Sequence, residues 1–317
     1  MAPHTLLIAG ATGNTGRGVI DTLSNLYHAN TPGVANHRIL ALTRSLQSPI
    51  AQQQAKLPGI TVIEQNWVEI TPAWLREHNV TRAFIASHNN PNQFAEESTF
   101  HVAALRAGVK YVVRISTTAA NVHPDYDAYY ARSHWAVEAM LDTPEFAALQ
   151  WTSLQPNIFT QVYLAPVAGW VQKYRATGEQ DTLRLVAAKD VPVGVVDPYE
   201  VGVLAARLLA EEDTARHNKR QYVVNGPENI TGQQVVEMVE REVGTEVKDV
   251  VFKDLSFIEW WIANRGGESM NVMQSIKFAP ITAWNGECKA ETTSKEVLEL
   301  AAPKRTPAEV LEKLLAE

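Results

Sequence analysis

Glycines at intervals of three follow the first apolar run of this chain, in the segment LLIAGATGNTGRGVI at residues 6–20. A glycine inside a strand or helix costs about 0.5–1 kcal/mol relative to alanine, so this spacing requires a reason. Between a buried strand and a helix, glycine permits a tight turn and lets a ligand approach the backbone. The amides and the positive dipole end of the helix then form an anion site that fits a pyrophosphate. The alternative is a glycine-rich turn without a ligand. The residues expected to bind a dinucleotide here are Gly10, Thr12, Gly13, Asn14, Thr15 and Gly16.

Short apolar runs alternate with helix-length segments over the first half of the chain, which predicts a Rossmann-type doubly wound parallel sheet. The helix expected at 91–108 has Phe94, Val102 and Leu105 as candidate core residues. Strands are expected at 5–10, 38–43, 60–65, 82–87, 110–116 and 151–159, and the other helices of this half at 14–27 and 127–141.

The pattern changes after about residue 160. A strand and a helix are expected within 191–211, with Asp197 as the N-cap, and again within 220–244, with Thr231 as the N-cap. Thr306 and Glu309 have the spacing of a capping box before the last helix. We therefore predict a dinucleotide-binding domain at 1–160 that includes the returning segment 191–230. The segments 161–190 and 231–317 form a smaller, mostly helical substrate domain.

Composition excludes several classes of protein. The chain has 317 residues and a net charge of −7, with no run of Lys or Arg suited to a nucleic acid. No apolar stretch reaches the roughly 18 residues that span a bilayer. The single cysteine, Cys288, excludes an internal disulfide framework and fits a reducing compartment. Because a strand begins almost at once, we expect no signal peptide and a cytosolic protein.

The end of the second strand indicates which dinucleotide is bound. NAD-binding proteins usually carry an acidic residue there, about 20 residues after the glycine loop. No acidic residue occurs between Asp21 and Glu64, and a polar insertion at 27–37 explains the greater distance to the end of this strand. The strand ends instead in Thr43, Arg44 and Ser45, whose guanidinium and hydroxyls suit a 2′-phosphate. We predict NADP(H) as the cofactor. A solvated surface arginine is the alternative.

The segments GATGNTG, RILALTRS, KYVVRIST, HWAVEAML, LQPNIFTQVYL and GPENITGQQVVEMV together resemble the NmrA-like family of atypical short-chain dehydrogenases/reductases. The resemblance covers residues 5 to about 245. It implies a Rossmann domain, a smaller C-terminal domain and a substrate cleft between them. The family includes reductases of quinones, imines and activated alkenes or carbonyls. It also includes sensors that bind NADP(H) and regulate partner proteins without chemistry.

The resemblance also nominates catalytic residues. Short-chain dehydrogenases use the pair Y-x-x-x-K, in which lysine lowers the tyrosine pKa and holds the nicotinamide ribose, together with an upstream serine. Here Ser116 and Tyr130 stand at the corresponding positions, but His134 replaces the lysine. We expect His134 to titrate near neutrality and to hydrogen-bond the ribose or relay a proton. A partly buried, hydrogen-bonded helix residue is the alternative for His134, and an ordinary core residue for Tyr130.

Loops at strand ends supply the remaining candidates, because ligands bind at the carboxyl edge of open parallel sheets. For each of them a plain loop role is the alternative. Expected cofactor contacts are Asn66, Trp67, Ser87, His88, Asn89, Pro156, Asn157, Ile158 and Phe159. The aromatic residues expected to contact a flat or aromatic substrate, with a core cluster as the alternative, are Phe257, Trp260, Trp261 and Trp284. His123 and Asp125 lack a convincing metal-ligand spacing, so no metal is expected.

The sequence therefore supports two functions. The first is an NADPH-dependent reductase that transfers hydride to a small conjugated or aromatic acceptor, such as a quinone, enone, imine or carbonyl. The second is a non-catalytic NADP(H) sensor that binds a protein partner. The missing lysine favours the sensor, whereas the aromatic residues near the C-terminus favour the enzyme, to which we give preference.

Overall fold

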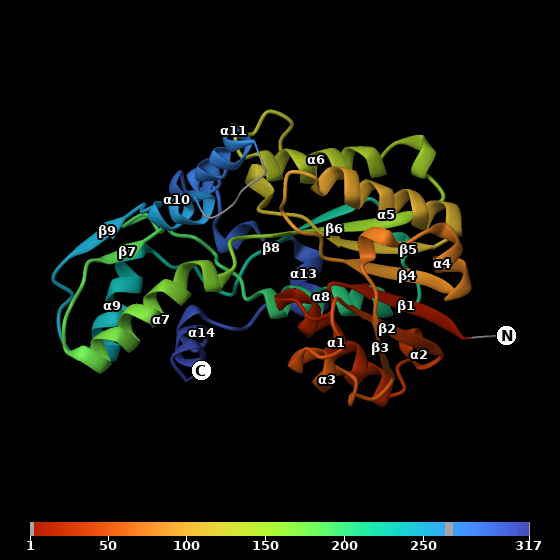
Figure 1. Ribbon diagram of the computed structural model, residues 1–317, viewed down its shortest axis with the longest axis horizontal. Helices are drawn as coiled ribbons and strands as arrows, with labels where there is room; N and C mark the ends of the chain where they lie inside the picture. Colours follow the sequence, from red (N-terminus) through yellow and green to blue (C-terminus); the bar gives the residue numbers. More distant parts are fainter. Residues whose placement is uncertain (1–2, 264–268, 317) are drawn as a thin grey trace.

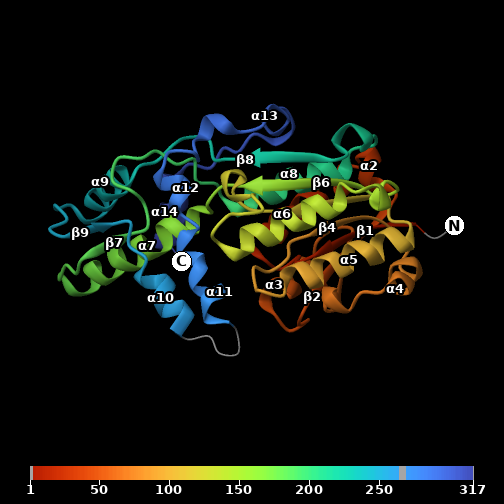
Figure 2. The same ribbon diagram turned by 90° about the horizontal axis from the view of Figure 1, so that it is seen from above.

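A parallel sheet of seven strands, counted over the described residues, forms one end of the molecule (Figures 1 and 2). The computed structural model describes residues 3–263 and 269–316, without the side chains of residues 260, 261 and 263. The strand order is β3-β2-β1-β4-β5-β6-β8, which confirms the predicted Rossmann-type doubly wound sheet. The strands are β1 (His4–Ala9), β2 (His37–Thr43), β3 (Ile60–Glu64), β4 (Val80–Ile85), β5 (Tyr111–Ile115), β6 (Gln150–Pro156) and β8 (Arg220–Val224).

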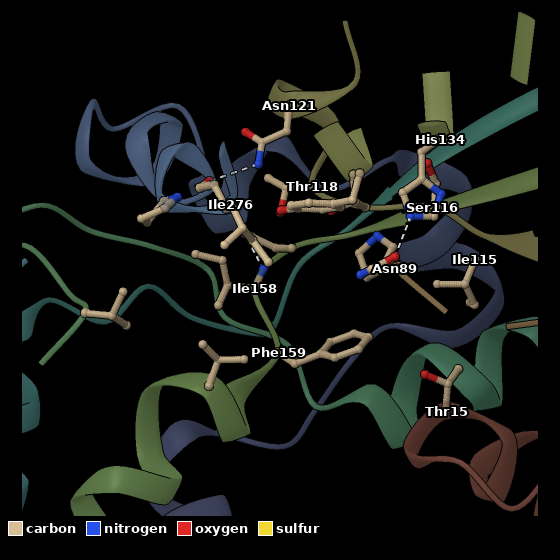
Figure 3. A pocket seen from close by; sticks show the side chains of 18 of the residues that line it. Thr15, Asn89, Ile115, Ser116, Thr118, Asn121, His134, Ile158, Phe159 and Ile276 are labelled. Carbon is tan, nitrogen blue, oxygen red and sulfur yellow. Dashed lines mark hydrogen bonds between the residues drawn. The ribbon is translucent and has the colours of Figure 1, made fainter. Parts of the chain in front are cut away.

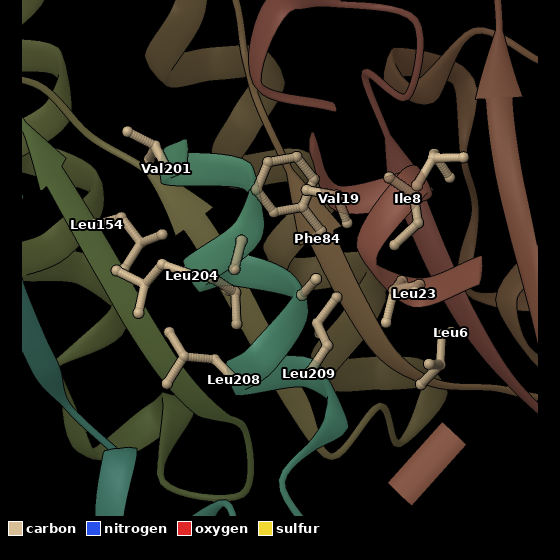
Figure 4. Packing of buried hydrophobic residues seen from close by; sticks show 14 of the residues in the cluster. Leu6, Ile8, Val19, Leu23, Phe84, Leu154, Val201, Leu204, Leu208 and Leu209 are labelled. Atoms are coloured by element: carbon tan, nitrogen blue, oxygen red, sulfur yellow. The ribbon is translucent and has the colours of Figure 1, made fainter. Parts of the chain in front are cut away.

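Helices cover both faces of this sheet, because its strands send apolar side chains to both sides. In β1, Leu6 and Ile8 join one buried cluster, shown in Figure 4, whereas Leu7 and Ala9 join another. The first face carries α1 (Asn14–His28), α2 (Pro32–Ala35), α8 (Pro198–Ala210) and α13 (Lys295–Ala301). The second carries α4 (Pro72–Glu77), α5 (Gln93–Ala107) and α6 (Tyr129–Leu141), while α3 (Pro49–Gln54) lies beside β3.

Helices α1 and α8 approach each other through glycine. A Cβ on Gly18 would lie 2.0 Å from the carbonyl oxygen of Tyr199, and one on Gly202 would lie 2.1 Å from that of Thr15. Since real Cβ atoms do not come so close to a backbone oxygen, only glycine permits this contact. The beginning of α1, with its glycine loop, is thereby fixed against the beginning of α8.

A second group of elements lies beyond the carboxyl ends of the strands (Figure 2). The short parallel pair β7 (Leu183–Leu185) and β9 (Val250–Phe252) packs with α7 (Thr160–Thr177), α9 (Gly232–Val243) and α14 (Pro307–Ala316). The helices α10 (Ser256–Ala263), α11 (Met270–Gln274) and α12 (Ile281–Trp284) complete this group. Short 3-10 helices join the elements: η1 (Trp67–Glu69), η2 (Ala119–Asn121), η3 (Pro144–Phe146), η4 (Ala215–His217), η5 (Ser275–Phe278) and η6 (Ala290–Thr292). The division into two domains stays a prediction.

The predicted helix starts are confirmed. The Asp197 carboxylate accepts from the Tyr199 amide at 2.9 Å. Thr231 forms a capping box with Gln234, and Thr306 forms one with Glu309. Within residues 3–263 and 269–316 we find no helix that is both long and apolar enough to cross a bilayer.

Three expectations about local structure are wrong. Phe94 is not a core residue, because its side chain is 40% exposed at the start of α5. The strand expected at 191–196 is reduced to isolated bridges at Val193 and Val196. The insertion at 27–37 is not simply polar: it contains α2, where Gly33 and Val34 are buried against α8.

Gly18→Ala is expected to lower the free energy of unfolding by about 1–3 kcal/mol or more, because the new methyl group overlaps the Tyr199 carbonyl. Gly169→Ala is the matched control, since a Cβ at this position in α7 meets nothing within 4 Å. It should leave stability unchanged or raise it by about 0.5–1 kcal/mol through helix propensity. Urea unfolding measures both, and equal effects would contradict the packing argument.

Candidate functional site

Two adjoining cavities lie at the carboxyl edge of the sheet. The larger, of about 850 Å³, runs along the ends of β1 to β4 and is called the glycine-loop groove below. The smaller, of about 360 Å³, lies at the ends of β4, β5 and β6 and is called the inner cavity (Figure 3). Ala86 and Ser87, which follow β4, line both. The two cavities therefore adjoin each other at these residues, at the point where the strand order reverses beside β1.

The glycine loop forms the wall of the groove next to β1. Gly10 has φ of +87°, in the region that favours glycine, and its carbonyl accepts from the Gly13 amide at 3.0 Å. A Cβ on Gly16 would lie 2.0 Å from the Gly10 oxygen, so this glycine packs the start of α1 onto the loop. No side chain caps α1, which leaves its first amides available to an anion. Gln54, which sequence reasoning missed, holds the loop by donating to the Ala11 carbonyl at 2.8 Å.

Arg44 lines the groove one strand away, with an exposed guanidinium. The hydroxyl of Thr43 is used within the turn, where it donates to the Ser45 carbonyl at 3.0 Å. Glu64 ends the neighbouring strand in register with Thr43, and its carboxylate accepts from the Leu46 amide at 3.0 Å. The end of the groove therefore contains one cation and one anion.

The opposite wall of the groove is aromatic. Asn66 caps η1, and the Trp67 ring lies 5.9 Å from the His88 ring, centroid to centroid. His88 pairs with Glu96, and its Nδ1 accepts from the Asn90 amide at 3.1 Å. Trp67 and His88 thus give this wall two aromatic rings, inclined at 41° to each other.

Many predicted residues line the inner cavity together. They are Thr15, Ser87, Asn89, Ser116, Tyr130, His134, Pro156, Asn157, Ile158 and Phe159. Asn157 contributes backbone and apolar surface only, because its carboxamide nitrogen contacts the carbonyls of Gly194 and Cys288 and the side chain of Asn225 at 2.8–3.1 Å. Asn14, Gly16 and Ser45 are not among the residues that line the two cavities.

His134 lies in a buried polar network behind the inner cavity. Its side chain is 1% exposed, and its Nδ1 lies 2.8 Å from Nη2 of Arg114 and 3.1 Å from Nε2 of Gln93. Its Nε2 lies 3.1 Å from Oδ1 of Asn89. Burial and, secondly, the Arg114 charge lower the pKa of His134 to about 3. The expectation that His134 titrates near neutrality is therefore wrong, and the ring is neutral at physiological pH.

Arg114 is the centre of this network and was missed by sequence reasoning. It is fully buried, and it donates to the Glu97 carboxylate at 2.6 Å, to that of Glu138 at 3.3 Å and to the Ser153 hydroxyl at 2.9 Å. Against the effect of burial, the Arg114 charge and hydrogen bonds hold the pKa of Glu97 well below its usual value. The signal that could have identified Arg114 is an arginine within an otherwise apolar strand, since buried charges are almost always paired.

Tyr130 and Ser116, the candidate catalytic hydroxyls, line the same cavity. Tyr130 lies one turn from His134, with its ring edge-on and 6.4 Å between centroids. Burial raises the pKa of Tyr130, while hydrogen bonds with Thr117 and Asn121 oppose the shift. The buried Ser116 hydroxyl has no hydrogen-bond partner within the described part of the chain. Tyr130 is thus a protonated group without a neighbouring ammonium to ease loss of its proton.

The aromatic residues expected to contact a substrate differ in where they lie. Trp284 is not among the lining residues: its indole donates to the Val186 carbonyl at 2.7 Å, and Lys253 lies over its ring. It supports the wall of the cavity, which Val186 lines directly. The side chains of Trp260 and Trp261 lie outside the described residues. Phe257, also on α10, lines the cavity, and its side chain is 46% exposed.

Fold and site together define a Rossmann-type protein with a glycine loop, a groove and an apolar inner cavity. The NmrA-like family model matches residues 3–299, and the chain belongs to this family. The resemblance seen in the sequence is confirmed.

Two curated relatives are reductases. A (4-alkanoyl-5-oxo-2,5-dihydrofuran-3-yl)methyl phosphate reductase of Streptomyces griseus is 25% identical over 244 residues, which are 77% of this chain and 75% of that protein. An NAD(P)H azoreductase of Xenophilus azovorans is 25% identical over 245 residues, 77% of this chain and 76% of that protein.

Solved structures share the whole fold. An NADPH-dependent quinone oxidoreductase of Escherichia coli, complexed with NADPH, superposes with a TM-score of 0.72 at 22% identity, covering 98% of this chain and 99% of that chain. NmrA, a negative transcriptional regulator, gives 0.66 at 13% identity, covering 99% and 96%. At these identities the likeness establishes the fold alone.

The low pKa of His134 makes stability depend on pH. Below pH 6.5 the unfolded state protonates this histidine whereas the folded state does not, so stability falls as the pH drops toward 3. His134→Gln should reduce that loss by up to about 1.4 kcal/mol per pH unit in urea unfolding between pH 6.5 and 5. The exposed His123→Gln serves as the control and should leave the slope unchanged. Equal slopes for wild type and His134→Gln would contradict the assigned neutral state.

Proposed function

We propose that this protein binds NADP(H) and reduces a small conjugated or aromatic molecule by hydride transfer. The observation that carries the proposal is that the glycine-loop groove and the inner cavity lie side by side and share Ala86 and Ser87. One molecule can extend from Arg44 past the glycine loop into an apolar chamber. The two reductase relatives, each 25% identical, support the same reaction class.

The residues present fit the cofactor. The Gly16 position has no space for a Cβ, and the uncapped amides of α1 suit a pyrophosphate. Arg44 would hold the 2′-phosphate, and Trp67 with His88 would flank the adenine. When bound, NADPH supplies the hydride. The chain's own task is then to hold the acceptor in the inner cavity and to exclude water around it.

The state of Tyr130 favours one kind of acceptor. A tyrosine whose pKa is raised by burial, with a neutral histidine in place of a lysine, gives up a proton reluctantly. Acceptors whose reduced form is a stabilised anion, such as quinones and conjugated enones, need no proton in the hydride-transfer step. We therefore propose quinones and enones ahead of simple ketones, with Phe257 and Ile158 providing apolar contact.

The raised pKa of Tyr130 and the neutral ring of His134 also support the second candidate function. This is a sensor that couples NADP(H) occupancy to binding of a partner protein. The shared fold of NmrA, a negative transcriptional regulator, is compatible with it.

Turnover separates the two candidates. NADPH oxidation, followed by absorbance, should proceed with at least one member of a panel of quinones, enones, imines and azo compounds. The quinones and enones should also be reduced faster than saturated ketones of similar size, which are assayed beside the panel. Tight NADPH binding without turnover of any acceptor would favour the sensor.

Arg44→Ala should weaken NADPH binding by about tenfold or more, because a charge-assisted hydrogen bond contributes about 1.5–3 kcal/mol. NADH binding should change little, since NADH lacks the 2′-phosphate. Arg207→Ala, which removes an exposed arginine of α8 outside both cavities, is the control. Calorimetric titration measures each affinity, and an unchanged preference for NADPH would refute the role given to Arg44.

A further inference from the structure

The tautomer of His134 is fixed by its neighbours. Arg114 cannot lose a proton in a protein and has only donors, so its Nη2 must donate across the 2.8 Å to Nδ1 of His134. Nε2 of Gln93, a second donor, lies 3.1 Å from the same nitrogen. Nδ1 is therefore the acceptor, and the single proton of the neutral ring lies on Nε2.

That proton orients a third residue. The Nε2–H of His134 donates to Oδ1 of Asn89 at 3.1 Å, which turns the amide nitrogen of Asn89 away from the histidine (Figure 3). The Asn89 backbone is held as well, because its carbonyl accepts from the Tyr129 hydroxyl. Its Nδ2 has no hydrogen-bond partner within the described part of the protein, and Asn89 lines the inner cavity. The cavity thus receives a fixed, neutral pair of N–H donors.

The arrangement is anchored in the core. Arg114 on β5 is held by Glu97 of α5 and Glu138 of α6, and all three are buried. His134 has no nitrogen left to contact a ligand, since both are engaged. Asn89, which lines the same cavity, therefore offers the side-chain N–H donors that His134 does not.

We propose that the Asn89 carboxamide, positioned by Arg114 through His134, donates to a ribose hydroxyl of bound NADPH, the task performed by lysine in the Y-x-x-x-K arrangement. His134 is then a positioning residue and neither a ligand nor a proton relay. The inference rests on the proposed function for its cofactor. It adds that a neutral amide substitutes for the ammonium.

A double-mutant cycle on NADPH binding tests this without turnover. Asn89→Ala removes the donors, and His134→Leu leaves the amide free to rotate. Each should raise the dissociation constant of NADPH by about three- to tenfold, the value of one hydrogen bond. Both substitutions disable the same hydrogen bond. The double variant should therefore bind NADPH no more weakly than whichever single variant has the lower affinity. Losses that multiply would overturn the proposal.

A conservative variant distinguishes orientation from proton transfer. In His134→Gln the side-chain N–H2 can occupy the place of Nε2–H, so NADPH affinity and turnover should stay within about twofold of wild type. An affinity as low as that of His134→Leu would overturn the proposal, as would normal affinity with lost turnover, which indicates a proton relay. If His134→Leu does not fold, the NADPH affinities of Asn89→Ala and His134→Gln still test the proposal. If the wild-type protein binds no NADPH, the proposed function itself fails, a result distinct from either outcome above.

Discussion

The buried guanidinium of Arg114 determines the geometry of the inner cavity. Removing a charge from water is costly, and the structure compensates with two carboxylates, a hydroxyl and an imidazole nitrogen from α5, α6 and β6. Replacing any one of these partners with an apolar residue would be destabilising, because part of the buried Arg114 charge would then lack compensation. The Arg114 network consequently holds together the elements that carry Ser87, Asn89 and Tyr130.

The outer half of the site is held by backbone contacts. Glycines bring α1 onto its own loop and against α8, so the amides at the start of α1 have fixed positions before any ligand arrives. Binding there requires little ordering of the chain, which preserves affinity. The inner half is instead lined by side chains with hydroxyls, amides and apolar surface. A rigid anion site thus adjoins a chamber whose chemistry depends on individual residues.

The sequence predicted the parts of the structure that depend on local pattern. The glycine spacing, the alternating strands and the caps at Asp197, Thr231 and Thr306 follow from short-range rules and were confirmed. What could not be predicted depends on long-range contacts. The pKa of His134 is lowered by burial and, secondly, by the charge of Arg114, 20 residues away on a neighbouring strand. Phe94 satisfies the helical period, yet it falls on the outer side of α5. The roles of the site residues stay predictions.

The position of Ala86 and Ser87 has a consequence for the whole site. These residues are common to both cavities, so they lie where the glycine-loop groove adjoins the inner cavity. A bulky side chain at either position would occupy space in both cavities at once. The size of these two side chains therefore limits how closely molecules held in the two cavities can approach each other.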